Sequence, residues 1–392
     1  MSLLLTLNAG SSSIKFALFE PRPQGLERLA VGQVEGLGEL AHFCAVTTAG
    51  ERHEQQIDGA AADHGHALQG VLDWLRLSFP NREVTAVSHR VVHGGAEHVE
   101  PILLDDENRA QLETLVPLAP LHQPHNLAGI DAARAAFPQA QQVACFDTSF
   151  HRSHPFVSDT FALPRQYYEQ GIRRYGFHGL SYEFISRQLK SRHPGLLAGR
   201  VIVAHLGNGA SMCAMRGGRS VASTMGFTAL DGLPMGTRCG QIDPGVLLYL
   251  VSERGMDAQS LTDLLYRNSG LKGMSGLSND MRVLLASDLP SAREAVDYFV
   301  EQCRRELGGL AASLGGLDAL VLTGGIGEHA AEVRSRLLRD MGWLGIEFDE
   351  SANLAGAEEI SLPRSPVRVL VLATDEERML AEHAAELSAL SS

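Results

Sequence analysis

The sequence lacks the features that mark secreted and membrane proteins. Its cysteines are few, odd in number and scattered, without a Cys-x-x-Cys pair, so no disulfide framework is indicated. No apolar run approaches the ~20 residues of a membrane span. The first residues have neither the basic start nor the cleavage site of a signal peptide. We therefore expect a cytoplasmic protein that does not bind a membrane.

Positive charge is also scarce. The 33 Lys and Arg residues face 46 Asp and Glu residues, which gives a formal net charge of −13. Such a balance argues against nonspecific binding to nucleic acid, whose phosphates attract cationic surfaces. Only three of the basic residues are lysines, Lys15, Lys190 and Lys272. Lys15 stands out because it lies just after a turn near the start of the chain.

The common nucleotide-binding and hydrolase motifs are missing as well. The chain has no Gly-Lys dipeptide, which excludes a Walker A loop, and no complete G-x-G-x-x-G. It has no H-E-x-x-H and no G-x-S-x-G. A nucleotide, if it binds, must be held by another arrangement.

Two similar strand-and-turn segments are present far apart in the chain. The apolar run 3–7 stops in the small-residue segment 8–13, and the run 201–206 stops in the segment 207–212. Backbone N–H groups and hydroxyls in such turns can cradle a phosphate. Each segment alone could equally be a plain hairpin turn. Together they suggest two similar halves that face one nucleotide.

The length and the apolar pattern predict a two-domain α/β protein. A chain of 392 residues exceeds the size of a comfortable single core. Apolar residues at helical spacing predict helices at 66–77 and 295–314. Short apolar runs of the kind found in buried strands occur at 3–7, 84–87, 143–146, 201–205, 319–323 and 367–373. We place the domain boundary near residue 150, where the second set of strands begins.

Several residues near these strands could serve phosphate chemistry. Arg90 follows the run 84–87, and Arg238 lies in a Gly-rich segment; guanidinium groups there suit carboxylate or phosphate oxygens. His178, between Phe and Gly, could donate to a phosphoryl oxygen. Asp147 and Glu376 lie near strand ends, where Mg²⁺ ligands often occur. Each of these residues alone could instead be a structural ion pair, a core histidine or a helix cap.

Taken together, these segments resemble the acetate/propionate/butyrate kinase family. The matching segments span residues 3 to about 380. They are NAGSSSIKF, HRVVHGG, APLHQPHN, FDTSFH, RRYGFHG, HLGNGAS, MGFTALDGL, MGTRCGQIDPG, TGGIGEH and ATDEE. The combination of NAGSSS, YGFHG and TGGIGE is highly specific.

The resemblance implies a sugar kinase/Hsp70/actin-type fold, with two duplicated ribonuclease-H-like domains and a central cleft. The first domain would cover 1–149, with a helix at about 377–392 packed back on it, and the nucleotide-binding domain would cover 150–376. It also implies a homodimer. The reaction would be the reversible, Mg²⁺- or Mn²⁺-dependent transfer of phosphate from ATP to acetate, which gives acetyl phosphate and ADP.

The resemblance also implies roles for individual residues. Arg90, Asp147, His178 and Arg238 would be catalytic, and Asn8, Asp147 and Glu376 would position the metal. The acyl group would contact Arg90, Val92, Leu121, Phe177 and Ala229. The phosphates would meet Asn8, Ser11, Ser12 and Lys15 in the first turn and His205, Asn208 and Gly209 in the second. The adenosine would face Asp280, Met281, Arg282, Gly325, Ile326 and Gly327.

Three readings stay open at this point. A carboxylate is already ionised at pH 7, so a site rich in Arg, His and Mg²⁺ suits an acid-accepting kinase without a strong base. Ala229 stands where the family usually has proline, which could admit a longer acyl chain such as propionate. A kinase of the same fold with a hydroxyl substrate could use Asp147 as a base, and a nucleotide-gated scaffold protein is the third reading.

Overall fold

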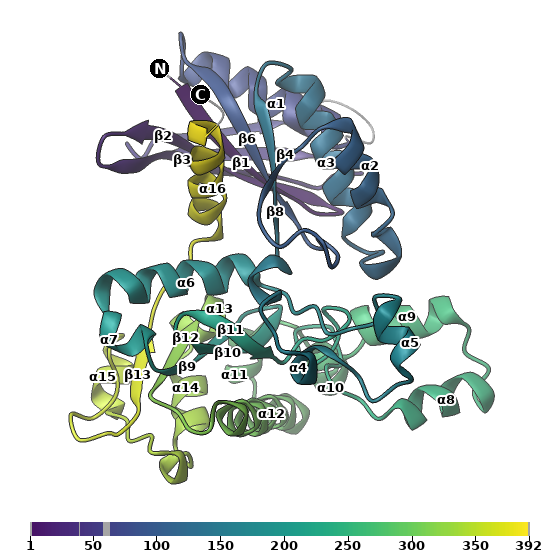
Figure 1. Cartoon of the computed structure of the whole chain (residues 1–392), viewed down its shortest axis with the longest axis vertical. Helices are drawn as coiled ribbons and strands as arrows, with labels where there is room; N and C mark the ends of the chain where they lie inside the picture. Colours follow the sequence, from purple (N-terminus) through teal and green to yellow (C-terminus); the bar gives the residue numbers. More distant parts are fainter. Residues whose placement is uncertain (1, 39, 58–62, 391–392) are drawn as a thin grey trace. The chain divides into compact units, whose positions relative to one another are not determined.

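A computed structural model describes residues 2–38, 40–57 and 63–390 of the chain. Contacts divide it into two units, Met1–Ser149 with Asp375–Ser392, and Phe150–Thr374. We call them unit 1 and unit 2. Each has its own sheet, and each is described by itself (Figure 1).

Unit 1 is built on an eight-stranded mixed sheet in the order β5-β4-β3-β2-β1-β6-β8-β7. The strands are β1 (Ser2–Ala9), β2 (Ser13–Arg22), β3 (Gly25–Glu35), β4 (His42–Thr47), β5 (Arg52–Gln56), β6 (Glu83–Val91), β7 (Ile102–Leu103) and β8 (Gln141–Phe146). The helices are α1 (His64–Ser78), α2 (Asp106–Glu113), α3 (Gln123–Ala136) and α16 (Glu376–Leu390), with a 3₁₀ turn at Val116–Leu118. Strands β1, β6 and β8 run parallel, and β1 to β5 form antiparallel pairs.

Alternation along β1 explains how helices cover both faces of this sheet. Leu3, Leu5 and Leu7 point to one face and share a core with α1 and the end of α3. The intervening residues point to the other face. Helix α16, from the far end of the chain, packs on β1 and β6 (Figure 1). Residues 375–390 therefore complete the first unit.

Unit 2 is built on a five-stranded sheet in the order β11-β10-β9-β12-β13. The strands are β9 (Arg200–Leu206), β10 (Ala210–Arg216), β11 (Arg219–Ser223), β12 (Ala319–Thr323) and β13 (Arg368–Val371). The helices are α4 (Phe156–Asp159), α5 (Arg165–Glu169), α6 (Gly179–Arg192), α7 (Pro194–Leu197), α8 (Pro244–Ser252), α9 (Ala258–Arg267), α10 (Gly270–Ser275), α11 (Met281–Leu285), α12 (Pro290–Leu314), α13 (Gly324–His329), α14 (Ala331–Leu338) and α15 (Glu350–Leu354). Two further 3₁₀ turns are Ser149–His151 and Gly342–Leu344.

The two sheets share one strand topology. In unit 1, β3-β2-β1-β6-β8 follow the order third, second, first, fourth and fifth along the chain. In unit 2, β11-β10-β9-β12-β13 follow the same order. In both, the first three strands pair antiparallel and the last two join them in parallel. The α/β class predicted from the sequence is confirmed, and the common order marks two related halves.

Two predicted strand boundaries need correction. Arg90 does not follow its strand but lies inside β6, because the parallel ladder with β8 continues through the pair Arg90–Cys145. The last strand is shorter than the apolar run 367–373, because β13 keeps its pairing with β12 only over Arg368–Val371. The described helices include none that combines the length and the apolar character of a membrane span.

Candidate active site

In unit 1, a buried ion cluster forms where two parallel strands end. Arg90 lies near the end of β6, and Asp147 directly follows β8, its neighbour. The Nε–H and Nη2–H groups of Arg90 donate to the Asp147 carboxylate over 2.8 to 3.1 Å. Nη1 of Arg90 lies 3.7 Å from an oxygen of Glu376, in the first turn of α16. One guanidinium therefore links two carboxylates from distant parts of the sequence.

The charges of this cluster stabilise one another. Burial lowers the pKa of the Arg90 guanidinium, but attraction to Asp147 and Glu376 outweighs burial and raises that pKa overall. The side chain of Arg90 keeps 20% of its surface exposed, so the cation can still reach a ligand. Arg90 therefore remains charged at any physiological pH.

The same cluster offers oxygen ligands of the kind that Mg²⁺ prefers. Mg²⁺ in phosphate sites takes one or two carboxylates and completes its shell with phosphate oxygens and water. Asp147 and Glu376 supply two carboxylates. Within 2–38, 40–57 and 63–390, no three His, Cys, Asp or Glu side chains gather as a metal site. Two carboxylates are what Mg²⁺ commonly takes from the protein in phosphate sites, so this donor set is compatible with such an ion.

The first turn connects β1 to β2 beside this cluster. It closes by a hydrogen bond from the Gly10 N–H to the Ser13 carbonyl oxygen (2.8 Å). Ser11 and Ser12 are exposed at its tip. Asn8 pairs with Lys15 across the hairpin. Because Leu7 pairs with His89, alternation places the next residues, Asn8 and Arg90, on the same face of the sheet.

Besides Arg90, the four residues expected around an acyl group divide between the units. In unit 1, Val92 is buried and its N–H donates to the side chain of Asn126 (3.0 Å), while Leu121 is half-buried just before α3. In unit 2, Phe177 is buried next to His178. The half-buried Ala229 accepts a hydrogen bond from Arg238 through its carbonyl oxygen (3.0 Å).

In unit 2, two histidines stack at the start of α6. His178 caps this helix with a left-handed backbone (φ 57°), which few residues with a side chain adopt. Its ring lies 4.4 Å from that of His205, centroid to centroid, at an interplanar angle of 24°. Nδ1 of His178 is 2.8 Å from the Ser211 hydroxyl, and Nδ1 of His205 is 2.8 Å from the Ser181 hydroxyl. Hydroxyl groups thus orient both rings.

The second turn, between β9 and β10, packs directly against this histidine pair. The Gly207 N–H donates to the Gly209 carbonyl oxygen (3.0 Å). A Cβ atom on Gly209 would lie 3.1 Å from Nε2 of His178, so a side chain there would crowd the ring. The carbonyl oxygen of Asn208 accepts from the Gly236 N–H (3.0 Å), and its Oδ1 accepts from Asn279 (3.1 Å).

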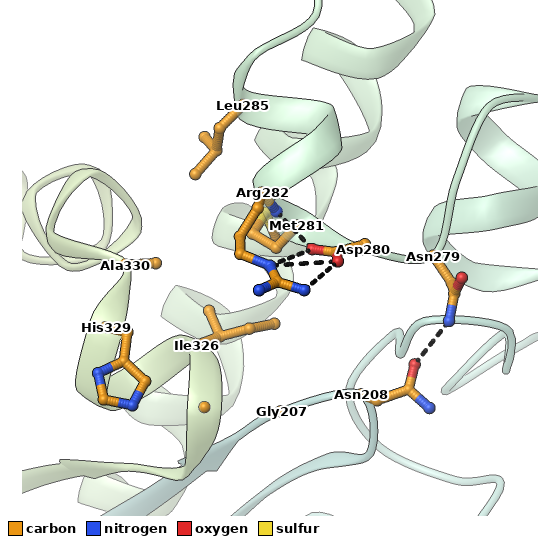
Figure 2. A pocket seen from close by; sticks show the side chains of 11 residues that line it. Gly207, Asn208, Asn279, Asp280, Met281, Arg282, Leu285, Ile326, His329 and Ala330 are labelled. Carbon is orange, nitrogen blue, oxygen red and sulfur yellow. Dashed lines mark hydrogen bonds and ion pairs between the residues drawn. The ribbon is translucent and has the colours of Figure 1, made fainter.

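Beside the second turn lies a cavity of about 570 Å³, a size suited to a nucleoside. Figure 2 shows Leu285 and Ile326 on facing elements, with an Asp280–Arg282 ion pair between them. Hydrogen bonds from Arg282 lower the pKa of Asp280 to about 2. The full lining is Gly207, Asn208, Asn279, Asp280, Met281, Arg282, Leu285, Gly325, Ile326, His329 and Ala330.

Six of the lining residues were predicted from the sequence, and they come from three separate segments. They are Asn208 in the second turn, Asp280, Met281 and Arg282 around the start of α11, and Gly325 and Ile326 in α13. Gly327 is not among the lining residues; it is buried near β9 and β12. Five further lining residues were not predicted from the sequence: Gly207, Asn279, Leu285, His329 and Ala330. Helical spacing could have predicted two of them, since Leu285 lies four residues after Met281 and Ala330 lies four residues after Ile326.

A protein-family model and relatives of known name match nearly the whole chain. The model of the "Acetokinase family" matches residues 3–382. An acetate kinase of Methylocella silvestris is 57% identical over 391 residues, with 97% of this chain and 96% of the relative covered. The crystal structure of Porphyromonas gingivalis acetate kinase has a TM-score of 0.88 at 36% identity, covering 99% of this chain and 100% of that one.

A propionate kinase from Francisella tularensis subsp. tularensis SCHU S4 is equally similar in structure. Its TM-score is 0.90 at 34% identity, and the match covers 98% of this chain and 99% of that one. The family resemblance inferred from the motifs is thereby confirmed. A match of this length and identity shows that the chain belongs to the acetokinase family.

Proposed function

We propose that this chain catalyses the reversible transfer of the γ-phosphoryl group of ATP to acetate, giving acetyl phosphate and ADP. The observation that carries the proposal is the family match over residues 3–382. The nucleoside-sized cavity next to the Gly207–Gly209 turn supports it independently of the match.

The chemistry needs no strong base. A carboxylate oxygen of acetate attacks the γ-phosphorus, the new P–O bond forms, and the bond to the bridging oxygen of ADP breaks. ADP leaves with the electron pair, and the total charge of reactants and products is equal without proton transfer. What remains for the protein is in-line positioning and the neutralisation of oxygen charge. Arginine, histidine and backbone N–H groups perform these tasks.

In unit 1, we assign Arg90 to the substrate carboxylate and the phosphoryl oxygens, because it is a permanent cation with an exposed edge. Asp147 and Glu376, with Asn8, would hold Mg²⁺. When bound, this ion would neutralise phosphate charge. Ser11, Ser12 and Lys15 offer exposed donors to the nucleotide phosphates.

In unit 2, we assign His178 to the phosphoryl group as a hydrogen-bond donor and Arg238 to substrate oxygens. His205, Asn208 and Gly209 would contact phosphate, which fits their position at the turn beside the cavity. The adenosine would lie between α11 and α13, against the side chains that Figure 2 shows there. We propose that the two units are the two ribonuclease-H-like domains of a cytoplasmic enzyme.

An acyl phosphate assay tests the reaction. The purified chain is incubated with ATP, Mg²⁺ and acetate, and hydroxylamine traps any acyl phosphate as a hydroxamate. We expect hydroxamate to form with acetate and to disappear when Mg²⁺ is chelated. Phosphorylation of a sugar hydroxyl, or nucleotide binding without any turnover, would contradict the proposal.

A second candidate, propionate kinase, is favoured by one observation, the structural similarity to the propionate kinase from Francisella tularensis. Ala229 would leave more room than proline, and each additional buried CH₂ group is worth ~0.8 kcal/mol. Specificity constants for acetate, propionate and butyrate separate the two. A constant for propionate above that for acetate would favour the second candidate, and Ala229→Pro would then restore the preference for acetate.

We also propose a homodimer that forms through helix α8. This helix is apolar along its length but has no buried residue; it exposes Val246, Leu248, Tyr249 and Val251. A continuous apolar helix at the surface is typical of a subunit interface. Leu248→Glu should turn the dimer into a monomer in light scattering. Leu77→Glu, at an equally exposed leucine of α1, should leave the dimer intact.

A further inference from the structure

A chain of buried hydroxyl groups ends at the imidazole of His178. The Tyr182 hydroxyl is hydrogen-bonded to the Ser211 hydroxyl, which is hydrogen-bonded to Nδ1 of His178 over 2.8 Å. Tyr182 and Ser211 are fully buried, and His178 is nearly so. Tyr182 lies one helical turn after His178 on α6, and Ser211 lies on β10. The contact therefore depends on packing of α6 against the sheet.

The number of protons limits the direction of these hydrogen bonds. Ser211 has one hydroxyl proton and can donate it to only one of its two partners. The contact permits either hydroxyl as the donor, and because a phenol is a stronger acid and a better donor than an aliphatic alcohol, donation from Tyr182 to Ser211 is favoured. Ser211 then donates to Nδ1 of His178. In the neutral imidazole, Nδ1 is an acceptor and the ring proton lies on Nε2.

That proton faces the second turn. Nε2 of His178 is the ring atom nearest to the position that a Cβ of Gly209 would take. The stacked ring of His205 also opposes a second positive charge, since two imidazolium ions at 4.4 Å would repel each other. The stacking therefore disfavours a charge on both rings at once, and Nε2 of His178 is directed to the glycine turn.

We propose that Tyr182 and Ser211 are positioning residues that hold His178 as its Nε2–H tautomer, so that it donates a hydrogen bond to the transferring phosphoryl group. This inference rests on the proposed function for the identity of the acceptor. The tautomer itself follows from the hydroxyl chain alone.

The test is the tautomer of His178 in the full-length protein labelled with ¹⁵N-histidine. Long-range ¹H–¹⁵N spectra distinguish a protonated from an unprotonated ring nitrogen, and His178→Gln identifies the signals. We expect Nε2 to be protonated in the unmodified protein. In Tyr182→Phe and in Ser211→Ala, we expect a mixture of both tautomers. A protonated Nδ1 in the unmodified protein, or an unchanged spectrum in both variants, would overturn the inference.

Kinetics supply the second readout. Tyr182→Phe removes one oxygen atom and should lower kcat about tenfold, while KM for acetate and ATP stays within twofold. In the His178→Gln background the same change should have no further effect, because Tyr182 acts through His178. A further tenfold loss in that background would overturn the inference.

Tyr175→Phe is the matched control. Tyr175 is also a buried tyrosine of unit 2, but its hydroxyl donates to the Gly171 carbonyl oxygen (2.8 Å) and not to the histidine chain. It should change neither the tautomer nor kcat. If the unmodified protein proved inactive with acetate while the tautomer was as expected, the proposed function would fail and the hydroxyl chain would stand.

Discussion

The turn between β1 and β2 and the turn between β9 and β10 follow the first strand of two sheets with one topology, yet their surroundings differ. The first turn exposes Ser11 and Ser12 and lies on a unit whose polar cluster consists of full charges, Arg90 with two carboxylates. The second turn is packed against a histidine pair whose rings are oriented by serine hydroxyls.

This difference shows that strand topology decides where a turn lies, while its neighbours decide what the turn can bind. An exposed turn beside a cation and two acids suits a metal-bound phosphate. A glycine turn that packs against two imidazole rings and lies beside a nucleoside-sized cavity suits the part of a nucleotide next to the nucleoside. Substitutions around the first turn should therefore affect the kinetics and stability differently from substitutions around the second turn.

The largest effect is expected at the charged cluster of unit 1. Arg90→Ala removes a phosphate-binding donor and leaves Asp147 and Glu376 without their cation. Losing one preorganised donor typically costs 10²–10³ in rate, so we expect kcat/KM for acetate to fall about 10³-fold in a folded protein.

The matched control is Arg109→Ala. Arg109 is similarly buried in unit 1 and also links two carboxylates, those of Glu113 and Asp131, but these acids are largely exposed. Exposed ion pairs contribute at most ~1 kcal/mol to stability, so activity should stay near normal. Equal losses for both variants in the hydroxamate assay would contradict the assignment of Arg90.

A fall in pH should lower the free energy of unfolding of both units, through a different histidine in each. Burial lowers the pKa of His89 in unit 1 and of His151 in unit 2 to about 4, well below the ~6.5 of an unfolded chain. The unfolded state therefore binds more protons between these values. The free energy of unfolding is therefore unaffected by these histidines above pH ~6.5. It decreases as the pH falls from ~6.5 to ~4, by up to about 3 kcal/mol per histidine.

Urea unfolding at several pH values checks this prediction. In a Trp343→Phe background, the buried Trp74 reports on unit 1 alone, and circular dichroism reports on both units. His89→Gln should flatten the pH dependence seen by Trp74. His151→Gln should leave that dependence unchanged and flatten only the dichroism signal. If His89→Gln left the pH dependence of the Trp74 signal unchanged, or if His151→Gln flattened it, other groups would control the acid response.

A smaller difference is expected between the glycines of the two turns. In Gly209→Ala, the new Cβ would lie 3.1 Å from Nε2 of His178, whose ring is held by stacking and by Ser211. We expect kcat to fall between tenfold and a hundredfold. In Gly10→Ala, the nearest atom is the Ser13 carbonyl oxygen at an ordinary 3.4 Å, so kcat should fall less than threefold. Steady-state kinetics measure both, and similar losses would remove the distinction between the turns.

The smallest effect is expected at the cavity wall. Ile326→Ala removes three carbon atoms from an apolar surface, each worth ~0.8 kcal/mol when fully buried. We expect KM for ATP to rise by about tenfold or less while KM for acetate stays constant. Val283→Ala, on an exposed side of α11 outside the cavity, is the control. A rise in the acetate KM alone would show that the cavity is not the nucleoside site.

The apolar runs alone predicted the six parallel strands of the two sheets, because a strand buried on both faces needs a continuous apolar sequence; the antiparallel strands between β1 and β6 and between β9 and β12 were not predicted. The small-residue segments after β1 and β9 predicted the two turns, since residues without large side chains leave the backbone accessible. The extent of β6 was not predicted, because its pairing with β8 extends the strand past its apolar residues to Arg90.

The sequence by itself determined the α/β class, the two turns and the family, since these depend on local composition and on short motifs. Only the tertiary structure decided that Glu376 lies beside Arg90, that Leu285 and Ile326 face one cavity, and that Ser211 joins Tyr182 to His178. These contacts join residues 29 to more than 280 positions apart for which no local pattern exists. Packing of helices against the sheets brings them together.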